Sequence, residues 1–128
     1  MSYLPNLDPE LHEGVYVFTT VPPGTDLAGL GVVATMHEPE GLTLVLPESQ
    51  AEQHGFDLAF RCAWITLWVD SALESVGLTA AFARALAEES IACNVIAGTH
   101  HDHLFVPVDR AADALQCLRE LQRRAAGD

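Results

Sequence analysis

An internal repetition of elements limits the folds open to this chain of 128 residues. Each half reads as strand, connection, strand, turn, strand, proline and helix. In the first half the apolar residues 42–46 lead through Pro47 into a short helix, and in the second half residues 104–106 lead through Pro107 into a longer one. Because repeated units set an architecture before any single motif does, the pattern predicts two related units in which helices pack beside strands.

Strand signals in the first half are separated by turn residues. Residues 15–21 alternate and are rich in β-branched and aromatic side chains, which is typical of a strand. Residues 32–36 and 42–46 flank the sequence Glu-Pro-Glu-Gly at positions 38–41, so they are predicted to pair as an antiparallel hairpin. A short helix is predicted between Pro47 and Gly55. Only residues 26–31 are available for a helix after the first strand, so the first unit is predicted to be degenerate.

The middle of the chain and its second half give clearer periods. Residues 58–69 are apolar and aromatic, and this segment is predicted to be strand throughout and shared between two sheets because it exceeds an ordinary strand length. Apolar residues then recur at helical spacing from Leu78 to Leu86. Two further strands are predicted at residues 91–97 and 104–108, followed by a helix that Asp109 caps.

Charge and composition exclude several functions. The net charge of −12 repels a nucleic-acid backbone, and all six basic residues are arginine, which excludes a lysine-dependent phosphate loop and a lysine Schiff base. No apolar run approaches the roughly 20 residues that span a bilayer, and the N-terminus lacks the pattern of a signal peptide. We therefore expect a cytoplasmic protein with no membrane partner, in which Cys62, Cys93 and Cys117 are reduced, buried thiols.

Several segments carry a resemblance to a known family. Residues 65–70, the sequence Val76-Gly77-Leu78, and then Leu86 and Ile91 resemble the ACT-domain signature, in which an acidic residue follows a strand and Gly-Leu begins a helix. The segments at 14–18, 40–45, 76–80, 93–98 and 101–107 extend the resemblance over nearly the whole chain, to small bacterial proteins of two tandem ACT-like units. This resemblance implies an α+β fold of two ferredoxin-like (βαββαβ) units, residues 1–61 and 62–128. Such proteins are similar to the regulatory domains of aspartate kinases, without an attached enzyme.

The resemblance also implies a ligand crevice between the loop at residues 70–78 and the strand at residues 94–96. The predicted ligand-binding residues are Asp70, Ser71, Glu74, Ser75, Val76, Gly77, Leu78, Asn94, Val95 and Ile96. Gly77 would permit a close backbone approach, the following helix offers unpaired amides to a carboxylate, and Asn94 supplies a donor and an acceptor. Each feature also has a purely structural interpretation, as a tight turn, a helix cap or a hydrogen-bonded strand residue.

Other clusters of reactive residues give weaker signals. His100, His101 and His103, with Asp102, are the one group with metal-ligand chemistry, but adjacent strand residues point to opposite faces and no fourth ligand is visible, so no metal or other cofactor is expected. No Gly-x-Ser-x-Gly elbow or cysteine-protease signature occurs, so no catalytic residue is predicted.

These observations predict a regulatory domain that binds a small molecule, with an amino acid as the expected ligand, without catalysis of its own. Exposed edge strands of ferredoxin-like sheets favour a homodimer. The alternative is a structural or protein-interaction module with no ligand, and an enzyme ranks third.

Overall fold

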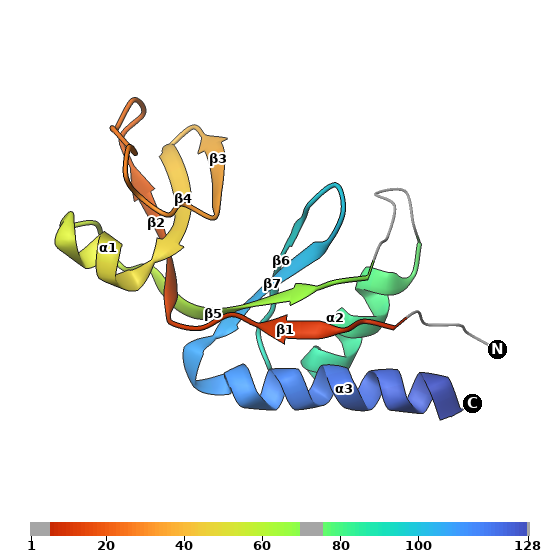
Figure 1. Ribbon diagram of the computed structural model, residues 1–128. Coiled ribbons are helices and arrows are strands. Elements are labelled where there is room, and N and C mark those ends of the chain that lie inside the picture. Colours follow the sequence, from red (N-terminus) through yellow and green to blue (C-terminus); the bar gives the residue numbers. More distant parts are fainter. Residues whose placement is uncertain (1–5, 70–75, 128) are drawn as a thin grey trace. The chain divides into compact units, whose positions relative to one another are not determined.

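The computed structural model describes residues 6–69 and 76–127 (Figure 1). Contacts within the chain divide it into two compact units. We call residues 13–62 the N-terminal unit, and residues 1–12 together with residues 63–128 the C-terminal unit. None of the helices in the described part of the chain is long and apolar enough to cross a membrane.

The N-terminal unit is an antiparallel sheet with one short helix. It contains β2 (Tyr16–Val21), β3 (Ala34–Glu38), β4 (Gly41–Pro47), α1 (Glu48–Gln53) and residues 60–62 of β5 (Phe60–Leu67). The strands lie in the order β3-β4-β2-β5, and β2 pairs antiparallel with both β4 and β5. Numbered along the chain this order is second, third, first, fourth, as in a ferredoxin-like sheet.

Alternating apolar residues give the N-terminal unit its core. Val17 and Val21 of β2 pack with Ala51 of α1 and with three leucines of β4, at positions 42, 44 and 46. Residues 22–33, where a ferredoxin-like unit has its first helix, form neither helix nor strand. Leu27 and Leu30 from this segment pack on the core instead. The predicted degeneracy of the first unit is therefore confirmed.

The C-terminal unit repeats this sheet order with two longer helices. It contains the rest of β5, α2 (Leu78–Glu88), β6 (Asn94–Ala97), β7 (Asp102–Pro107), a 3-10 turn (Val108–Arg110), α3 (Ala111–Gly127) and β1 (Pro9–Leu11). β5 lies between β1 and β7, and β6 follows β7 at the edge. Within this unit β5, β6 and β7 are the first, second and third strands, and β1 takes the place of the fourth. The order β1-β5-β7-β6 is then fourth, first, third, second, which is the order of the N-terminal unit read from the other edge. The N-terminus of the chain thus completes the second unit.

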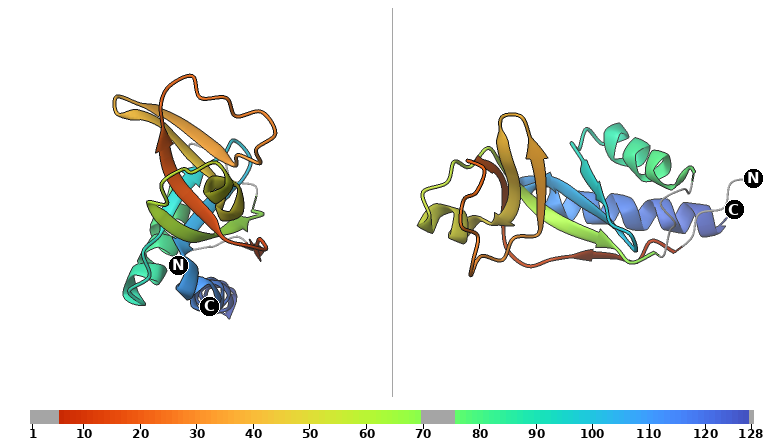
Figure 2. Two further views of the ribbon diagram at one scale, coloured as in Figure 1. Left: turned by 90° about the vertical axis from the view of Figure 1, so that its left-hand side faces the viewer. Right: turned by 90° about the horizontal axis from the view of Figure 1, so that it is seen from above.

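Helices α2 and α3 lie on the same face of the C-terminal sheet, as Figures 1 and 2 show. Ile65 and Leu67 of β5 point toward these helices and are fully buried against Phe82, Leu86 and Leu118. The intervening residues of β5 point to the other face because side chains alternate along a strand. This second face carries polar and aromatic groups.

The structure confirms most predicted elements and corrects several of their bounds, with the strands predicted at residues 32–36 and 104–108 found at Ala34–Glu38 and Asp102–Pro107. The prediction of strand throughout residues 58–69 is wrong at both ends, because the ladder pairs residues 60–62 with β2 and residues 65–67 with β1. Strand β6 begins at Asn94 rather than residue 91, since the amide of Ile91 still donates to Leu86 at the end of α2. Asp109 makes no capping hydrogen bond and lies inside the 3-10 turn that follows Pro107.

The repetition itself is confirmed in the backbone. Pro47 and Pro107, which precede the helical segments of the two units, have φ, ψ values of −58°, 136° and −53°, 140°. The boundary predicted between residues 61 and 62 stays a prediction. The strand that contains both residues belongs to both units.

Candidate functional site

The loop predicted to contact a ligand is described only at its end. Asp70, Ser71, Glu74 and Ser75 lie outside the described residues. Val76 is 97% exposed, and Gly77 precedes α2 with φ of +104° in the left-handed region. An added Cβ at Gly77 would meet no atom within 4 Å. Within the described part of the chain nothing therefore crowds Gly77 at the start of α2, whereas the side chain of Leu78 is buried in the core.

The three predicted residues on β6 divide between the two faces of the sheet. Val95 packs against the helix-side core. Asn94 is exposed and lies opposite Phe105 of β7, and Ile96 lies opposite His103. Since paired residues of an antiparallel ladder share a face, Asn94 and Ile96 point to the polar side.

Gly77 and Asn94 lie near opposite ends of α2. Gly77 caps the N-terminus of the helix, whereas Ile91, three residues before Asn94, is hydrogen-bonded to Leu86 in the last turn. At a rise of about 1.5 Å per residue, the nine steps from Gly77 to Leu86 cover roughly 13 Å. A small ligand at Gly77 would therefore meet the later residues of β6 before it meets Asn94.

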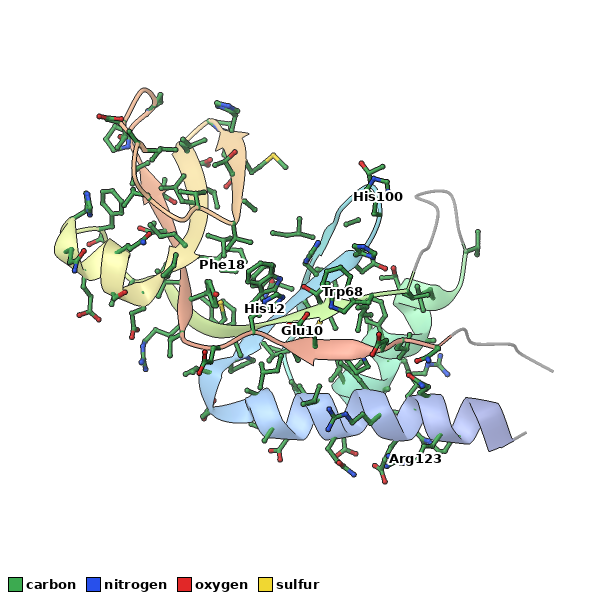
Figure 3. All side chains as sticks on the ribbon, in the orientation of Figure 1. Glu10, His12, Phe18, Trp68, His100 and Arg123 are labelled. Carbon is green, nitrogen blue, oxygen red and sulfur yellow. The ribbon has the colours of Figure 1, made fainter. Side chains whose placement is uncertain are left out.

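A chain of hydrogen bonds crosses the polar face of the C-terminal sheet. Oγ1 of Thr66 lies 2.7 Å from Nε2 of His12 and 3.1 Å from Nδ1 of His103. Nε1 of Trp64 donates to the same Nδ1 atom over 3.1 Å, and the His12 ring stacks on Trp64 with centroids 3.6 Å apart. We call His12, Trp64, Thr66 and His103 the histidine network. Figure 3 shows His12 on the side of the strands away from α3.

Donor and acceptor chemistry fixes the protonation of the network. An indole nitrogen can only donate, so Nδ1 of His103 must accept and the proton of this neutral ring is on Nε2. Two acceptors 3.1 Å apart would repel each other, so the Thr66 hydroxyl also donates to Nδ1 and accepts from Nε2 of His12. Each of these three contacts then joins a donor to an acceptor with both histidines neutral.

Electrostatics favours the same neutral state. Burial, followed by the nearby His101 and His12 rings, lowers the pKa of His103, and Asp102 opposes this shift. Burial also lowers the pKa of His12, opposed by Glu10. Thr66 is 1% exposed, so its hydroxyl orients the two rings and cannot attack a substrate.

Trp68 marks the solvent-exposed side of this face. Its ring is 47% exposed, and its Nε1 donates to Oε1 of Glu10 over 2.6 Å. His101 meets Trp68 edge-on with centroids 4.6 Å apart, and its Nδ1 atom lies 3.4 Å from the carbonyl oxygen of Val69. Glu10 and Trp68 lie close together in Figure 3.

The histidine-rich turn has no metal-binding geometry in the part of the chain that the structure describes. No group of three His, Cys, Asp or Glu side chains there could hold a metal ion. His103 and His101 have the partners given above, and His100 is exposed at the turn.

The thiols are poor nucleophiles. Burial raises the pKa of Cys62 to about 12 and that of Cys93 to about 11. The pKa of Cys117 is raised as well, first by burial and then by nearby glutamates. All three are unpaired cysteines and remain protonated near neutral pH.

Sequence reasoning missed the histidine network. The alternation Trp64-x-Thr66-x-Trp68 could have identified a polar and aromatic face opposite the core, because side chains alternate along a strand. No signal pointed to His12, whose position depends on the pairing of β1 with β5.

Two sequence models of the ACT domain match the chain, one over residues 2–63 and the other over residues 59–120. Together they cover both units and overlap in β5. No curated protein sequence matches.

Solved structures give the same fold. A protein of unknown function from Vibrio cholerae, titled a possible transport protein, is 52% identical over 88% of this chain and 87% of its own, with a TM-score of 0.83. A protein from Agrobacterium tumefaciens is 16% identical over 93% of this chain and 91% of its own, with a TM-score of 0.74. The regulatory subunit of aspartate kinase from Thermus thermophilus is 10% identical over 91% of this chain and 98% of its own, with a TM-score of 0.69.

Proposed function

The chain belongs to the ACT-domain family, as two tandem ACT units, and we propose that it is a regulatory module that binds an amino acid and has no catalytic activity. The ligand-binding, regulatory character follows from the family. The amino acid and the lack of catalysis are the proposal. Its ligand residues are the ten predicted from the sequence.

The observation that carries the proposal is the start of α2, where no side chain among the described residues caps the helix. Gly77 has a left-handed φ and no side chain to cap the helix, and a Cβ added to it would meet none of the described residues within 4 Å. The first amides of α2 can therefore donate hydrogen bonds to the carboxylate of an amino acid, and the helix dipole favours that charge. The ammonium group would bind carboxylates of the preceding loop, for which Asp70 and Glu74 are the candidates.

Asn94 and Ile96 would contribute from the polar face. Asn94 is exposed, and no side-chain hydrogen bond joins it to the described residues. Its amide can thus bind a ligand without the loss of an internal contact. Leu78 and Val95 point into the core, so their contribution to the site would come from the backbone and from packing.

The state of the thiols supports a function without covalent catalysis. Raised pKa values keep Cys62 and Cys93 protonated, and the thiolate is the reactive form. The buried Thr66 beside two histidines cannot reach a substrate either.

A thermal-shift screen of the amino acids tests the ligand, since a molecule that binds only the folded state raises the melting temperature. The best ligand is then titrated by calorimetry, with an affinity expected between about micromolar and millimolar. Because Asn94 lies near the opposite end of α2 from Gly77, Asn94→Ala should weaken binding less than Gly77→Val does, without a change in stability. If no amino acid shifts the melting temperature, the ligand proposal is wrong.

A matched pair separates ligand contact from backbone strain at Gly77. Gly14 also has a positive φ, +93° against +104°, and open space for a side chain. Gly77→Val and Gly14→Val should therefore destabilise the fold to a similar degree, while only Gly77→Val blocks the ligand. Equal affinity in the two variants would place the ligand elsewhere.

A second candidate, a protein-interaction module, is favoured by strand β3. This strand is at the sheet edge, and Met36 on it is 63% exposed. An exposed edge strand is a template for pairing with another chain, and we propose a homodimer formed in this way. Light scattering that shows a dimer, together with an empty ligand screen, would favour this candidate, and Met36→Lys should then yield monomers.

A further inference from the structure

We propose that the C-terminal unit contains a second binding site, for a small molecule that carries a carboxylate or phosphate group. The site is a cavity of about 290 Å³ between the segment before β1 and the later turns of α3. It is lined by Asn6, Asp8, Pro9, Arg119, Gln122 and Arg123. This site does not depend on the proposed amino-acid ligand.

Two arginines give the cavity its chemistry. Arg119 and Arg123 are four residues apart on α3, so their side chains share one face of the helix. Among the described residues ion pairs join only Arg61 with Glu48 and Arg110 with Asp113, so neither arginine of the cavity is paired with a carboxylate there. In a chain with a net charge of −12, two neighbouring guanidinium groups on one helix face form a local patch of positive charge. Their planar forks match the oxygens of a carboxylate or phosphate.

Two amide side chains add donors. Oε1 of Gln122 accepts from the backbone amides of Leu7 and Asp8, over 2.9 and 3.3 Å. Oδ1 of Asn6 accepts from the amide of Asp8 over 3.0 Å. Both oxygens are thus occupied, and the remaining NH₂ groups can only donate. The lining therefore offers two guanidinium groups and two amide donors.

The backbone of Asp8 holds this lining in shape. Asp8 has φ of +43°, a left-handed value that aspartate and asparagine adopt more readily than other residues with a side chain. Its carboxylate also lines the cavity and opposes an anion. Two positive charges against one negative charge still leave the cavity positive, on an otherwise acidic protein.

Calorimetric titration of the whole protein with inorganic phosphate and with citrate, at low salt, tests the site and distinguishes the two oxyanions. Arg119→Gln and Arg123→Gln should each weaken binding by about tenfold or more, since a hydrogen bond to a charged group contributes about 1.5 to 3 kcal/mol. Arg84→Gln is the matched control, because Arg84 is exposed on α2 and does not line the cavity. It should leave the affinity unchanged.

Two further variants separate recognition from folding. Gln122→Glu keeps an acceptor for the amides of Leu7 and Asp8 but replaces the NH₂ donor with a negative oxygen, so binding should be lost while the melting temperature changes little. In Asp8→Asn, the asparagine can adopt the same φ and removes the opposing negative charge, so the affinity for phosphate and citrate should rise. Absence of phosphate and citrate binding at about 10 mM, or equal losses in Arg84→Gln and Arg119→Gln, would overturn the proposal. A retained amino-acid response in Gln122→Glu would show that the two sites are separate.

Discussion

Nε1 of Trp64 donates a hydrogen bond to Nδ1 of His103 over 3.1 Å, and this contact requires the histidine to be neutral. A proton on Nδ1 would bring two donors together and leave the indole N–H without its acceptor. Because the pKa of His103 is lowered in the folded state, the unfolded chain binds more protons below the ordinary histidine pKa of about 6.5. The network therefore stabilises the C-terminal unit fully above that pH and loses its contribution as the pH falls.

We expect the melting temperature to decrease as the pH is lowered from about 7 to 5. His103→Asn removes the titrating group and leaves an amide oxygen that can accept from Trp64, so its melting temperature should change less over this range. His37→Asn, an exposed control on β3, should follow the wild-type profile. Identical profiles for wild type and His103→Asn would show that the network does not control acid stability.

Two buried threonines should respond in opposite ways to replacement by valine. Thr66, 1% exposed, is hydrogen-bonded to two histidines, whereas Oγ1 of Thr19, 2% exposed, has no hydrogen-bond partner among the described residues. Thr66→Val should lower the free energy of unfolding by about 1 to 3 kcal/mol, because it leaves polar groups unsatisfied. Thr19→Val should be neutral or stabilising. Urea unfolding measures both, and equal losses would contradict the assigned network.

The turn before β4 tests steric exclusion at a glycine. A Cβ at Gly41 would lie 2.8 Å from the carbonyl oxygen of Val21 and 2.9 Å from Cγ2 of Thr20, whereas a Cβ at Gly24 would meet nothing within 4 Å. Both residues have a positive φ, so both alanine variants incur a conformational cost of about 1 kcal/mol or more. Gly41→Ala should be clearly the less stable variant by thermal unfolding, because it also displaces β2. Similar stabilities would show that the hairpin can shift freely.

The thiols should react slowly in the folded protein. Cys62 is fully buried and Cys117 is 7% exposed, whereas Cys93 is half-buried, so Cys93 should react first with a coloured disulfide reagent. Unfolding in guanidinium should expose all three thiols at once. Fast reaction of a native thiol at neutral pH would contradict the raised pKa values and indicate an activated cysteine.

Local periodicity was enough to predict the repeated part of the fold. The alternation of residues 15–21 and the apolar spacing from Leu78 to Leu86 match β2 and α2 because burial on one face imposes those periods. Strand β1 was not predictable in this way. Its three residues, Pro-Glu-Leu, have no strand signal, and their pairing with β5 depends on contacts more than fifty positions away.

The faces of the β6 residues proposed for the ligand site were predictable to the same degree. Period two places Asn94 and Ile96 on one face and Val95 on the other, as found. The link from His12 to Thr66 was hidden because it requires β1 beside β5. Asn6 and Arg123 likewise line the same cavity although they are far apart in the sequence, and no local sequence pattern predicts such a contact.

The position of β1 also imposes an order of events during synthesis on the ribosome. Residues 13–62 leave the ribosome as a complete set of four strand segments before α3 is made. β1 precedes these segments, yet it packs against α3, which follows all of them. It must therefore remain unpaired until β5 has emerged, and its packing cannot finish until α3 has emerged. A rare codon or a truncation within α3 would prolong the exposure of β1 and of the incomplete C-terminal core, the stage at which a nascent chain is most prone to aggregate.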